Sequence, residues 1–540
     1  MVGRHEEAKL SMTTDFDAIV VGAGFAGLYM LHRLRGEGFR VRVYEAGAGI
    51  GGTWYWNRYP GARCDVESMQ YSYQFSEELQ EEWDWSEKYA TQPEILAYAE
   101  HVADRFDLHR DIQLNTTVAA AHYDEISDCW CLELGDGAVV TARYCVMALG
   151  CLSTTNKPAF AGLEDFQGAV YHTGEWPHEG VDFTGARVGI IGTGSSAIQT
   201  IPVIAKQAAH LTVFQRTPNF AIPAYNAPLE PGEVRAIKAD YAGLRSKAKA
   251  RPTGVYFQSN DFSAQAIEEE ARTKIYQEYW DRGGLSFLGA FNDLLLDEAS
   301  NDTAAAFVRG KIREKVADPQ IAALLAPDTI IGCKRLCVDS GYFETFNRDN
   351  VTLIDISEDP IDGFTATGLT IAGNAHTFDA AVFATGFDAM TGSFTRIDIR
   401  GRGGLPLVKK WEAGPRTFLG LATAGFPNMF MITGPGSPSV LASMIQTIEQ
   451  HVEWIIDCMG HMRDHDHTMI EADVTHEDAW VDHVNEAAAG SLRSTCSSWY
   501  LGGSIPGRPR VFMPYIGGFP IYVEKCDSVA AAGYEGFHLA

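Results

Sequence analysis

The feature that most constrains the fold of this chain is a glycine-rich loop that occurs twice. In the first copy, a β-branched run at residues 17–21 ends at Gly22, and Gly24 and Gly27 complete a GxGxxG pattern before a helical stretch. A second strand then ends at Glu45, which gives the element order of a dinucleotide-binding unit. Gly22 makes the tight turn, Gly24 lets the backbone approach a pyrophosphate, and Gly27 permits close helix–strand packing. We therefore predict a dinucleotide site in which Glu45 accepts hydrogen bonds from a ribose diol.

The second copy of the loop follows a strand at residues 187–191 and has alanine as its last small residue, which the fingerprint allows. It consists of Gly192, Thr193, Gly194, Ser195, Ser196 and Ala197. In the first copy, Glu45 follows Gly22 by 23 residues. Gln215 follows Gly192 by the same 23 residues, so we expect Gln215 at the ribose-reading position, beside Arg216. A guanidinium can bind a 2′-phosphate as a fork, whereas a carboxylate would repel it. We predict NADPH at this site; the alternative is that Arg216 is a solvated charge at a strand end.

Two dinucleotide units in one chain predict two cofactors and a nested arrangement of domains. The first unit fits FAD, because Gly52, Thr53 and Trp54 follow its second strand and can reach a flavin-side phosphate and ring. We predict an α/β fold with two Rossmann-like domains, in which the NADPH domain is nested in the FAD domain and carries a helical insertion. The expected ranges are a flexible N-terminal tail at 1–16, the FAD-binding domain at 17–150 and 386–540, the NADPH-binding domain at 151–223 and 333–385, and the insertion at 224–332.

The insertion shows helical patterns at two places. Ser263 has the position of an N-cap before an acidic first turn, and residues 307–316 space their apolar side chains for one helix face. The insertion is either a scaffold or one wall of a substrate cavity, because small ligands usually bind where domains meet.

Composition and charge exclude several classes of protein. Asp and Glu outnumber Lys and Arg by 70 to 43, and a net charge of −27 would repel nucleic acid and anionic lipid. No apolar run of about 18 residues is free of charge, so we expect no membrane partner. Ten cysteines without a framework spacing indicate reduced thiols and a cytoplasmic location. The sequence has no CxxC redox pair, no paired histidine ligands and no GxSxG elbow, so a disulfide reductase, a metal site and a serine hydrolase are not expected.

A longer motif lies just before the second glycine loop. Residues 166–177 read FQGAVYHTGEWP and resemble the FxGxxxHxxxWP signature of single-chain (type I) Baeyer–Villiger monooxygenases, which use FAD and NADPH. The related flavin-containing monooxygenases, which oxidise amines and sulfides, resemble it but lack the final Trp-Pro. Residues 52–65, GTWYWNRYPGARCD, resemble the second long motif of the Baeyer–Villiger family. The resemblance runs from residue 17 to residue 537, and it is strongest to the branch of phenylacetone and steroid monooxygenases.

The resemblance implies roles for particular residues. Arg335 would be the catalytic arginine and Asp65 its carboxylate partner, although spacing alone makes Lys334 and Arg335 no more than a basic pair at the surface. His172 would be structural, the stretch 439–442 would line the substrate pocket, and no metal is implied. The implied FAD contacts are Gly22, Gly24, Gly27, Glu45, Gly52, Thr53, Trp54, Tyr55, Trp56, Asp65, Tyr71, Val118 and Met444. The implied NADPH contacts are Arg63, Cys64, Gly192, Thr193, Gly194, Ser195, Ser196, Ala197, Gln199, Arg216, Thr217, Lys334, Arg335 and Trp499.

The resemblance also implies a reaction. NADPH would reduce FAD, O₂ would add to give a C4a-peroxyflavin, and attack on a small-molecule ketone would give an ester or lactone, with sulfoxidation as a side activity. A fixed guanidinium would keep the peroxide anionic and stabilise the oxyanion. Three alternatives remain: a flavin N- or S-monooxygenase, an NADPH:acceptor reductase and a non-catalytic redox sensor. Trp176 and Pro177, together with Asp65 and Arg335, argue against the first of these.

Overall fold

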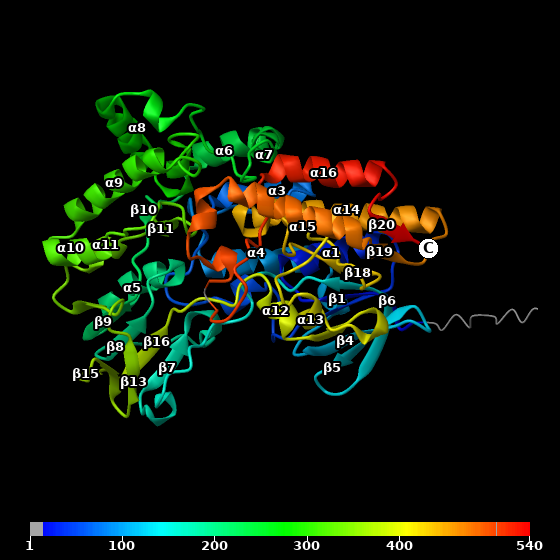
Figure 1. Cartoon of the computed structure of the whole chain (residues 1–540), viewed down its shortest axis with the longest axis horizontal. Helices are drawn as coiled ribbons and strands as arrows, with labels where there is room; N and C mark the ends of the chain where they lie inside the picture. The colour runs from blue at the N-terminus through cyan, green and yellow to red at the C-terminus, as the bar shows by residue number, and fades with distance from the viewer. Residues whose placement is uncertain (1–13, 504) are drawn as a thin grey trace, which may run out of the picture.

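The computed structural model describes residues 14–503 and 505–540 (Figure 1). The predicted flexible tail, residues 1–16, lies outside the described part of the chain as far as residue 13. For its last residue the prediction is wrong, because Phe16 opens the first strand. Asp15 is also anchored, since its carboxylate accepts a hydrogen bond from the Thr141 amide at 2.9 Å.

The first domain is built on a sheet in the order β17-β4-β5-β6-β1-β2-β3, with β18 also paired to β6. The strands β6, β1, β2 and β3 are parallel, and β1 is buried as an apolar central strand must be. Because β17 and β18 lie far along the chain, their pairing with β4 and β6 brings the C-terminal part back to this sheet. The bounds are β1 Phe16–Val21, β2 Val41–Tyr44, β3 Ile112–Gln113, β4 Val118–Asp124, β5 Cys129–Leu134, β6 Val139–Met147, β17 Asp398–Arg400 and β18 Met429–Met431.

The second domain contains a five-stranded parallel sheet in the order β12-β9-β8-β16-β7. An antiparallel meander, β13-β14-β15, continues the chain between β12 and β16. The bounds are β7 Ala169–His172, β8 Arg187–Ile191, β9 His210–Gln215, β12 Val351–Asp355, β13 Ile361–Thr365, β14 Gly368–Ile371, β15 Asn374–Thr377 and β16 Ala380–Phe383, and the helix α5 after the second glycine loop spans Ser195–Gln207. This sheet lies to the left in Figure 1, and the first sheet lies to the right.

Helices separate β9 from β12, and most of them form the upper left of Figure 1. Buried side chains of these helices, such as Tyr276 and Ile312, share one core with Val188 and Ile190 of β8, which joins this part to the second domain. Ser263 is an N-cap as expected, since its hydroxyl accepts from the Gln265 amide at 3.0 Å, but it caps a separate 3₁₀ turn. The acidic first turn belongs to the next helix, α8, which begins at Glu269. The elements are β10 Ala221–Pro223, α6 Pro231–Ala239, α7 Tyr241–Lys249, α8 Glu269–Arg282, α9 Glu298–Lys315, α10 Pro319–Leu325, β11 Cys337–Asp339 and α11 Tyr342–Thr345.

The remaining helices belong with the first sheet. The longest, α14, lies against α1, and both Tyr29 and Arg33 of α1 donate hydrogen bonds to the carboxylate of Glu453 on α14. The bounds are α1 Phe25–Gly36, α2 Thr53–Trp56, α3 Glu77–Glu82, α4 Gln92–Arg105, α12 Gly392–Thr395, α13 Leu407–Lys410, α14 Met444–Asp464, α15 Val474–Ala489 and α16 Phe519–Ala531, with a last strand pair, β19 Ile470–Ala472 and β20 Phe537–Leu539.

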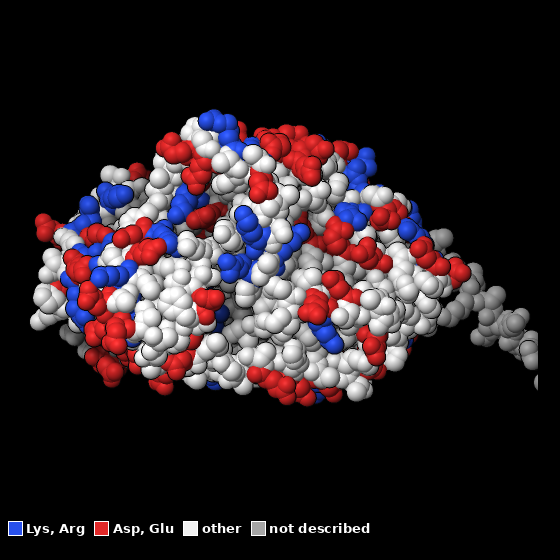
Figure 2. Space-filling view, turned by 90° about the horizontal axis from the view of Figure 1, so that it is seen from above, with Lys and Arg blue, Asp and Glu red and all other residues white. Residues whose placement is uncertain are grey.

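The described residues include no helix that is both long and apolar enough to cross a membrane. On the face drawn in Figure 2, acidic side chains form several groups with basic side chains between them, in keeping with the excess of Asp and Glu.

Candidate active site

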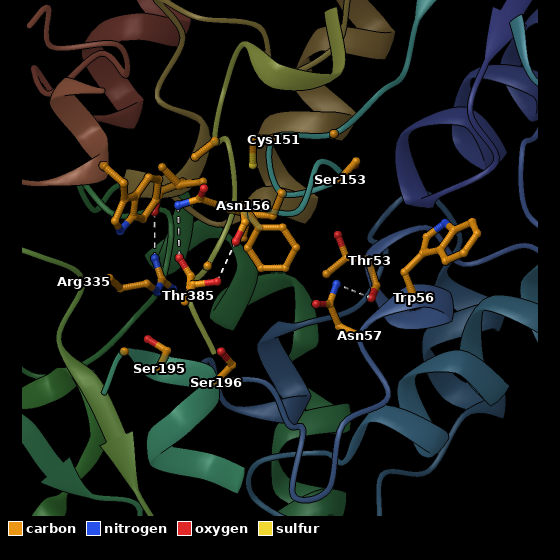
Figure 3. A pocket seen from close by; sticks show the side chains of 18 of the residues that line it. Thr53, Trp56, Asn57, Cys151, Ser153, Asn156, Ser195, Ser196, Arg335 and Thr385 are labelled. Carbon is orange, nitrogen blue, oxygen red and sulfur yellow. Dashed lines mark hydrogen bonds between the residues drawn. The ribbon is translucent and has the colours of Figure 1, made fainter. Parts of the chain in front are cut away.

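A cavity of about 1390 Å³ extends from the first glycine loop to the second. Its walls include the segments around Gly150 and Thr385, where the chain passes between the two sheets. In Figure 3 these linkers lie between Thr53 and Asn57 on one side and Ser195 and Arg335 on the other. The space is larger than a usual single-ligand pocket, so it can accept two dinucleotides and a small substrate.

The first loop has the backbone geometry that its glycines predict. Gly22 has φ +103°, and a Cβ there would lie 2.6 Å from the carbonyl oxygen of Ala148. A Cβ on Gly27 would lie 1.9 Å from the Gly22 carbonyl oxygen, so only glycine lets α1 pack this closely on β1. The N-cap of α1, Gly24, has no side-chain cap, which leaves the first amides of the helix available to an anion. Glu45 lines the cavity, and its carboxylate accepts hydrogen bonds from the amide of residue 23 at 2.7 Å and from that of residue 47 at 2.8 Å.

The second loop repeats this arrangement with more open space. Gly194 is the N-cap of α5 without a side-chain cap, and nothing lies within 4 Å of where its Cβ would be. The Thr193 hydroxyl donates to the carbonyl oxygen of Thr217 at 2.7 Å, which fixes the loop to the end of β9. Arg216 and Lys334 both line the cavity here. Burial lowers the pKa of Lys334, and the positive charge of Arg216 lowers it further, so the two cations face the same space.

The expectation that Gln215 takes the ribose-reading position is wrong. Its side chain is buried, and its amide donates to the carbonyl oxygen of Leu324 in α10 at 2.7 Å, away from the loop. Gln215 is the last residue of β9, where alternate side chains point to opposite faces, so Arg216 is the one that reaches the cavity.

Asp65 and Arg335 come from segments 270 residues apart and form a two-pronged ion pair on the cavity wall. The distances are 2.5 Å from Nε of Arg335 to Oδ2 of Asp65 and 2.8 Å from Nη2 to Oδ1. A third donor, Nη1, binds the carbonyl oxygen of Val440 at 2.7 Å. The side chains are only 29% and 24% exposed, so the interpretation of Arg335 as part of a basic surface pair is wrong. Burial opposes the charge, but the Asp65 carboxylate raises the pKa of Arg335 above its usual range.

The ion pair fixes the guanidinium of Arg335 but does not engage all of its hydrogen-bond donors. Of its five N–H bonds, three are engaged by Asp65 and Val440, and two remain for a reacting group in the cavity. The site therefore presents a fixed positive charge with unused donors, which is the arrangement that stabilises a developing oxyanion.

A loop near the C-terminus, residues 491–503, covers the side of the cavity next to Arg335. Trp499 lies on the cavity wall with its ring centroid 4.2 Å from that of Tyr500. The loop is anchored at its start, because Nε of Arg493 donates to the carbonyl oxygen of Gly332 at 3.0 Å.

His172 joins the two linkers. Its Nε2 lies 3.3 Å from the carbonyl oxygen of Asn156 and 3.3 Å from the hydroxyl of Thr385, while Nδ1 accepts from the Gly174 amide at 3.0 Å. Burial lowers the pKa of His172, so the ring is held as the neutral imidazole at the end of β7.

Most residues expected at the two cofactors line this one cavity, but three do not: Gly27, Tyr55 and Ala197. Gly27 and Ala197 lie in helix–sheet contacts, and the Tyr55 ring packs beside Gly47 and against His178, with a centroid distance of 4.8 Å. Sequence reasoning missed several other lining residues. Tyr59 lies inside the motif at 52–65 and could have been found there; Thr116, Asn156, Thr385 and Cys496 have no local signal. From the expected stretch 439–442, Val440 and Ala442 do line the cavity.

The geometry fits FAD at the first loop and NADPH at the second. Both glycine turns leave the amides at a helix start without a side-chain partner, which suits pyrophosphate. Glu45 lines the cavity at the first loop, where FAD presents a ribose diol. Arg216 and Lys334 line it at the second loop, where NADPH presents a 2′-phosphate. A fold of this kind, with a fixed arginine between the loops, defines an oxidoreductase that uses a flavin and a nicotinamide cofactor.

Comparisons with known proteins narrow this class. Residues 19–248 match the family model described as pyridine nucleotide-disulphide oxidoreductase. A Baeyer–Villiger monooxygenase of Pseudooceanicola batsensis is 42% identical over 96% of this chain and 95% of its own length. A phenazine N-monooxygenase of Lysobacter antibioticus is 43% identical over 97% of each chain. The solved structure of an oxidised steroid monooxygenase bound to NADP matches with a TM-score of 0.93 and 52% identity, over 97% of this chain and 99% of that one.

This chain belongs to the Baeyer–Villiger monooxygenases that depend on FAD and NADPH. The resemblance drawn from the sequence motifs is thereby confirmed, as is the α/β fold with two dinucleotide-binding domains. The protein is a flavin monooxygenase, and its cofactors are FAD and NADPH.

Proposed function

We propose that this protein uses NADPH and O₂ to convert a small-molecule ketone into an ester or lactone. The observation that carries the proposal is the two-pronged Asp65–Arg335 pair on a cavity that both glycine loops share. Bound FAD and NADPH would supply the electrons and the activation of oxygen. The protein supplies position and charge.

Arg335 is the proposed catalytic residue. Its two unused N–H bonds would stabilise the negative charge that develops on the ketone oxygen. Asp65 would keep the guanidinium plane in place, because a carboxylate that accepts from both Nε and Nη2 leaves it one orientation. Trp499 and Met444 would limit the space beside the substrate, since both lie on the cavity wall.

The cofactor contacts follow from the same geometry. The first loop with Glu45 would hold FAD, together with the other expected residues that line the cavity on that side. The second loop would hold NADPH, with Arg216, Thr217 and Lys334 at the 2′-phosphate. We also propose the domain ranges expected from the sequence, with the first domain extended to include Phe16, since the strand order of both sheets fits a second domain nested in the first. A cytoplasmic location is in keeping with ten free cysteines.

The test is a panel of linear, cyclic, aryl and steroid ketones, incubated with the FAD-loaded protein and NADPH in air and analysed by mass. We expect NADPH consumption that depends on the ketone, and a product heavier by one oxygen atom that hydrolyses to an acid and an alcohol. A parallel arm with a sulfide and an aromatic N-heterocycle measures heteroatom oxidation, because one relative is named an N-monooxygenase. Sulfoxide formed more slowly than ester would fit a side activity. Oxidised heteroatoms without any ester would overturn the proposal.

A further inference from the structure

Two cysteines meet on the cavity wall beside Arg335. Cys333 precedes Lys334 and Arg335, and Cys496 lies in the C-terminal loop three residues before Trp499. Both are buried from outside solvent and both line the cavity. The two thiols lie close enough to shift each other's pKa, and the Cys496 thiol donates to the carbonyl oxygen of Leu492 at 3.6 Å. The proposed reaction uses neither thiol.

Other hydrogen bonds hold the C-terminal loop in place independently of the thiols. Arg493 donates from Nε to the carbonyl oxygen of Gly332 at 3.0 Å. The Leu492 amide donates to the carbonyl oxygen of Leu295 at 2.9 Å, so the loop is fixed to the insertion as well. A disulfide needs two sulfurs brought together by such a scaffold, with little backbone movement.

The surroundings make one of the two thiols reactive. The neighbouring Cys496 thiol lowers the pKa of Cys333 against the effect of burial, and the positive charges of Lys334 and Arg493 lower it further. At Cys151, on the same cavity wall, burial outweighs the Ser439 hydrogen bond and the charge of Arg335, raises the pKa to about 11 and leaves that thiol protonated at neutral pH. The thiolate is the form that reacts with peroxides.

We propose that Cys333 and Cys496 form a reversible disulfide when hydrogen peroxide enters the cavity. The Cys333 thiolate attacks one peroxide oxygen, the O–O bond breaks, and a sulfenic acid forms as hydroxide leaves and takes up a proton to become water. The Cys496 thiol then attacks the sulfenic sulfur and releases a second water. Two thiols and one H₂O₂ thus give one disulfide and two waters, and a dithiol reductant reverses the change.

The bond would tie the C-terminal loop to the segment that carries Lys334 and Arg335. Trp499 would then be held at the cavity wall, and exchange of the nicotinamide cofactor past the loop would slow. This consequence rests on the proposed NADPH site, whereas formation of the disulfide does not.

The experiment treats the FAD-loaded protein with a small excess of hydrogen peroxide, then blocks free thiols and measures the mass with and without dithiothreitol. We expect a loss of about 2 Da that dithiothreitol reverses, and one non-reduced peptide pair that joins Cys333 to Cys496. Cys333→Ser and Cys496→Ser should each abolish this pair while retaining FAD absorbance. Cys131→Ser is the matched control, because Cys131 also has a neighbouring thiol, that of Cys129, but within β5, and it should leave the pair intact.

Gains of oxygen mass without the Cys333–Cys496 peptide, or a linked peptide between other cysteines, would overturn the disulfide. The loop consequence is measured on the same samples as the rate of flavin reduction by NADPH. We expect that rate to fall severalfold on oxidation and to recover with dithiothreitol in the wild type and in Cys131→Ser. An unchanged rate in fully linked protein would overturn the consequence alone. Absence of flavin reduction in the untreated protein would instead count against the proposed function.

Discussion

Two arginines on the cavity differ in how they are held. Arg335 donates two hydrogen bonds to the Asp65 carboxylate and is largely buried, whereas Arg216 is exposed. An exposed arginine adapts its side chain to a ligand and contributes only when the ligand is present. A buried pair such as Asp65–Arg335 loses solvation, and two short hydrogen bonds to Asp65 and one to the Val440 carbonyl replace part of that solvation.

Asp65→Ala should retain FAD but lose most oxygenation. Without the carboxylate the guanidinium can rotate away from the reacting oxygen, and loss of one preorganised donor costs about 10²–10³ in rate. The ester yield of Asp65→Asn should lie between those of the wild type and Asp65→Ala, because an asparagine side chain has only one oxygen that can accept from the guanidinium. The measurement is ester formed per NADPH, with bound flavin determined from its absorbance. Purified Asp65→Ala without flavin would show instead that this carboxylate is needed to bind the cofactor.

Arg216→Ala should discriminate between the two nicotinamide coenzymes. A charged hydrogen bond contributes about 1.5–3 kcal/mol, so KM for NADPH should rise by roughly 10- to 100-fold. KM for NADH should change little, because NADH has no 2′-phosphate. Initial rates with both coenzymes measure this, and equal effects on both would contradict a phosphate contact at Arg216.

At the scale of elements, the sequence predicts the glycine units closely. The strands around both loops lie where their β-branched runs indicate, and α5 begins at Ser195, within the second loop. Local signals fail where tertiary contacts decide: Ser263 caps a separate short turn rather than α8, and Gln215 is buried against α10. Neither local pattern nor spacing could bring Asp65 to Arg335, since that contact depends on how two domains pack; only the resemblance to a family predicted it.

Alanine at two loop glycines should separate folding from cofactor binding. Gly194→Ala adds a methyl group into open space, so the fold and FAD content should be unchanged, while NADPH should bind at least about tenfold more weakly because the methyl group occupies the approach of the pyrophosphate. Gly27→Ala places its methyl group 1.9 Å from a backbone oxygen, so α1 must shift, and FAD and thermal stability should both be lost. The two variants are compared by their flavin content, their Tm and their KM for NADPH. Normal NADPH affinity in Gly194→Ala would contradict the second site.

At the scale of the whole molecule, two linkers and one long helix join the parts. His172 connects the linkers at Asn156 and Thr385. On α14, the carboxylate of Glu449 accepts hydrogen bonds from the amides of residues 74 and 75, at 2.6 and 3.1 Å, and so connects the C-terminal part to the first domain. These contacts join the two sequence halves of the first domain.

Glu449 should make stability depend on pH. Burial raises the pKa of Glu449 from 4.5 to about 7, against its backbone hydrogen bonds and the charge of Arg245, so the folded state keeps a proton that the unfolded state releases. The free energy of unfolding should therefore fall between pH 4.5 and 7, by at most about 1.4 kcal/mol per pH unit. Glu449→Gln, whose amide oxygen can still accept both bonds, should flatten this window. Tm measured from pH 4.5 to 8 tests it, and identical profiles for both proteins would contradict the assignment.

The most direct test of the account is the yield of oxygenated product per NADPH in Arg335→Ala, with hydrogen peroxide counted in parallel. The variant should bind FAD through the first loop and NADPH through Arg216 and the second loop, so flavin reduction should persist. Ester should fall by at least about 10²–10³, because the fixed charge is gone. Arg335→Lys should recover little, since an ammonium lacks the planar fork that Asp65 holds. Ester yield close to wild type in Arg335→Ala would contradict the central claim that Arg335 carries the oxygenation.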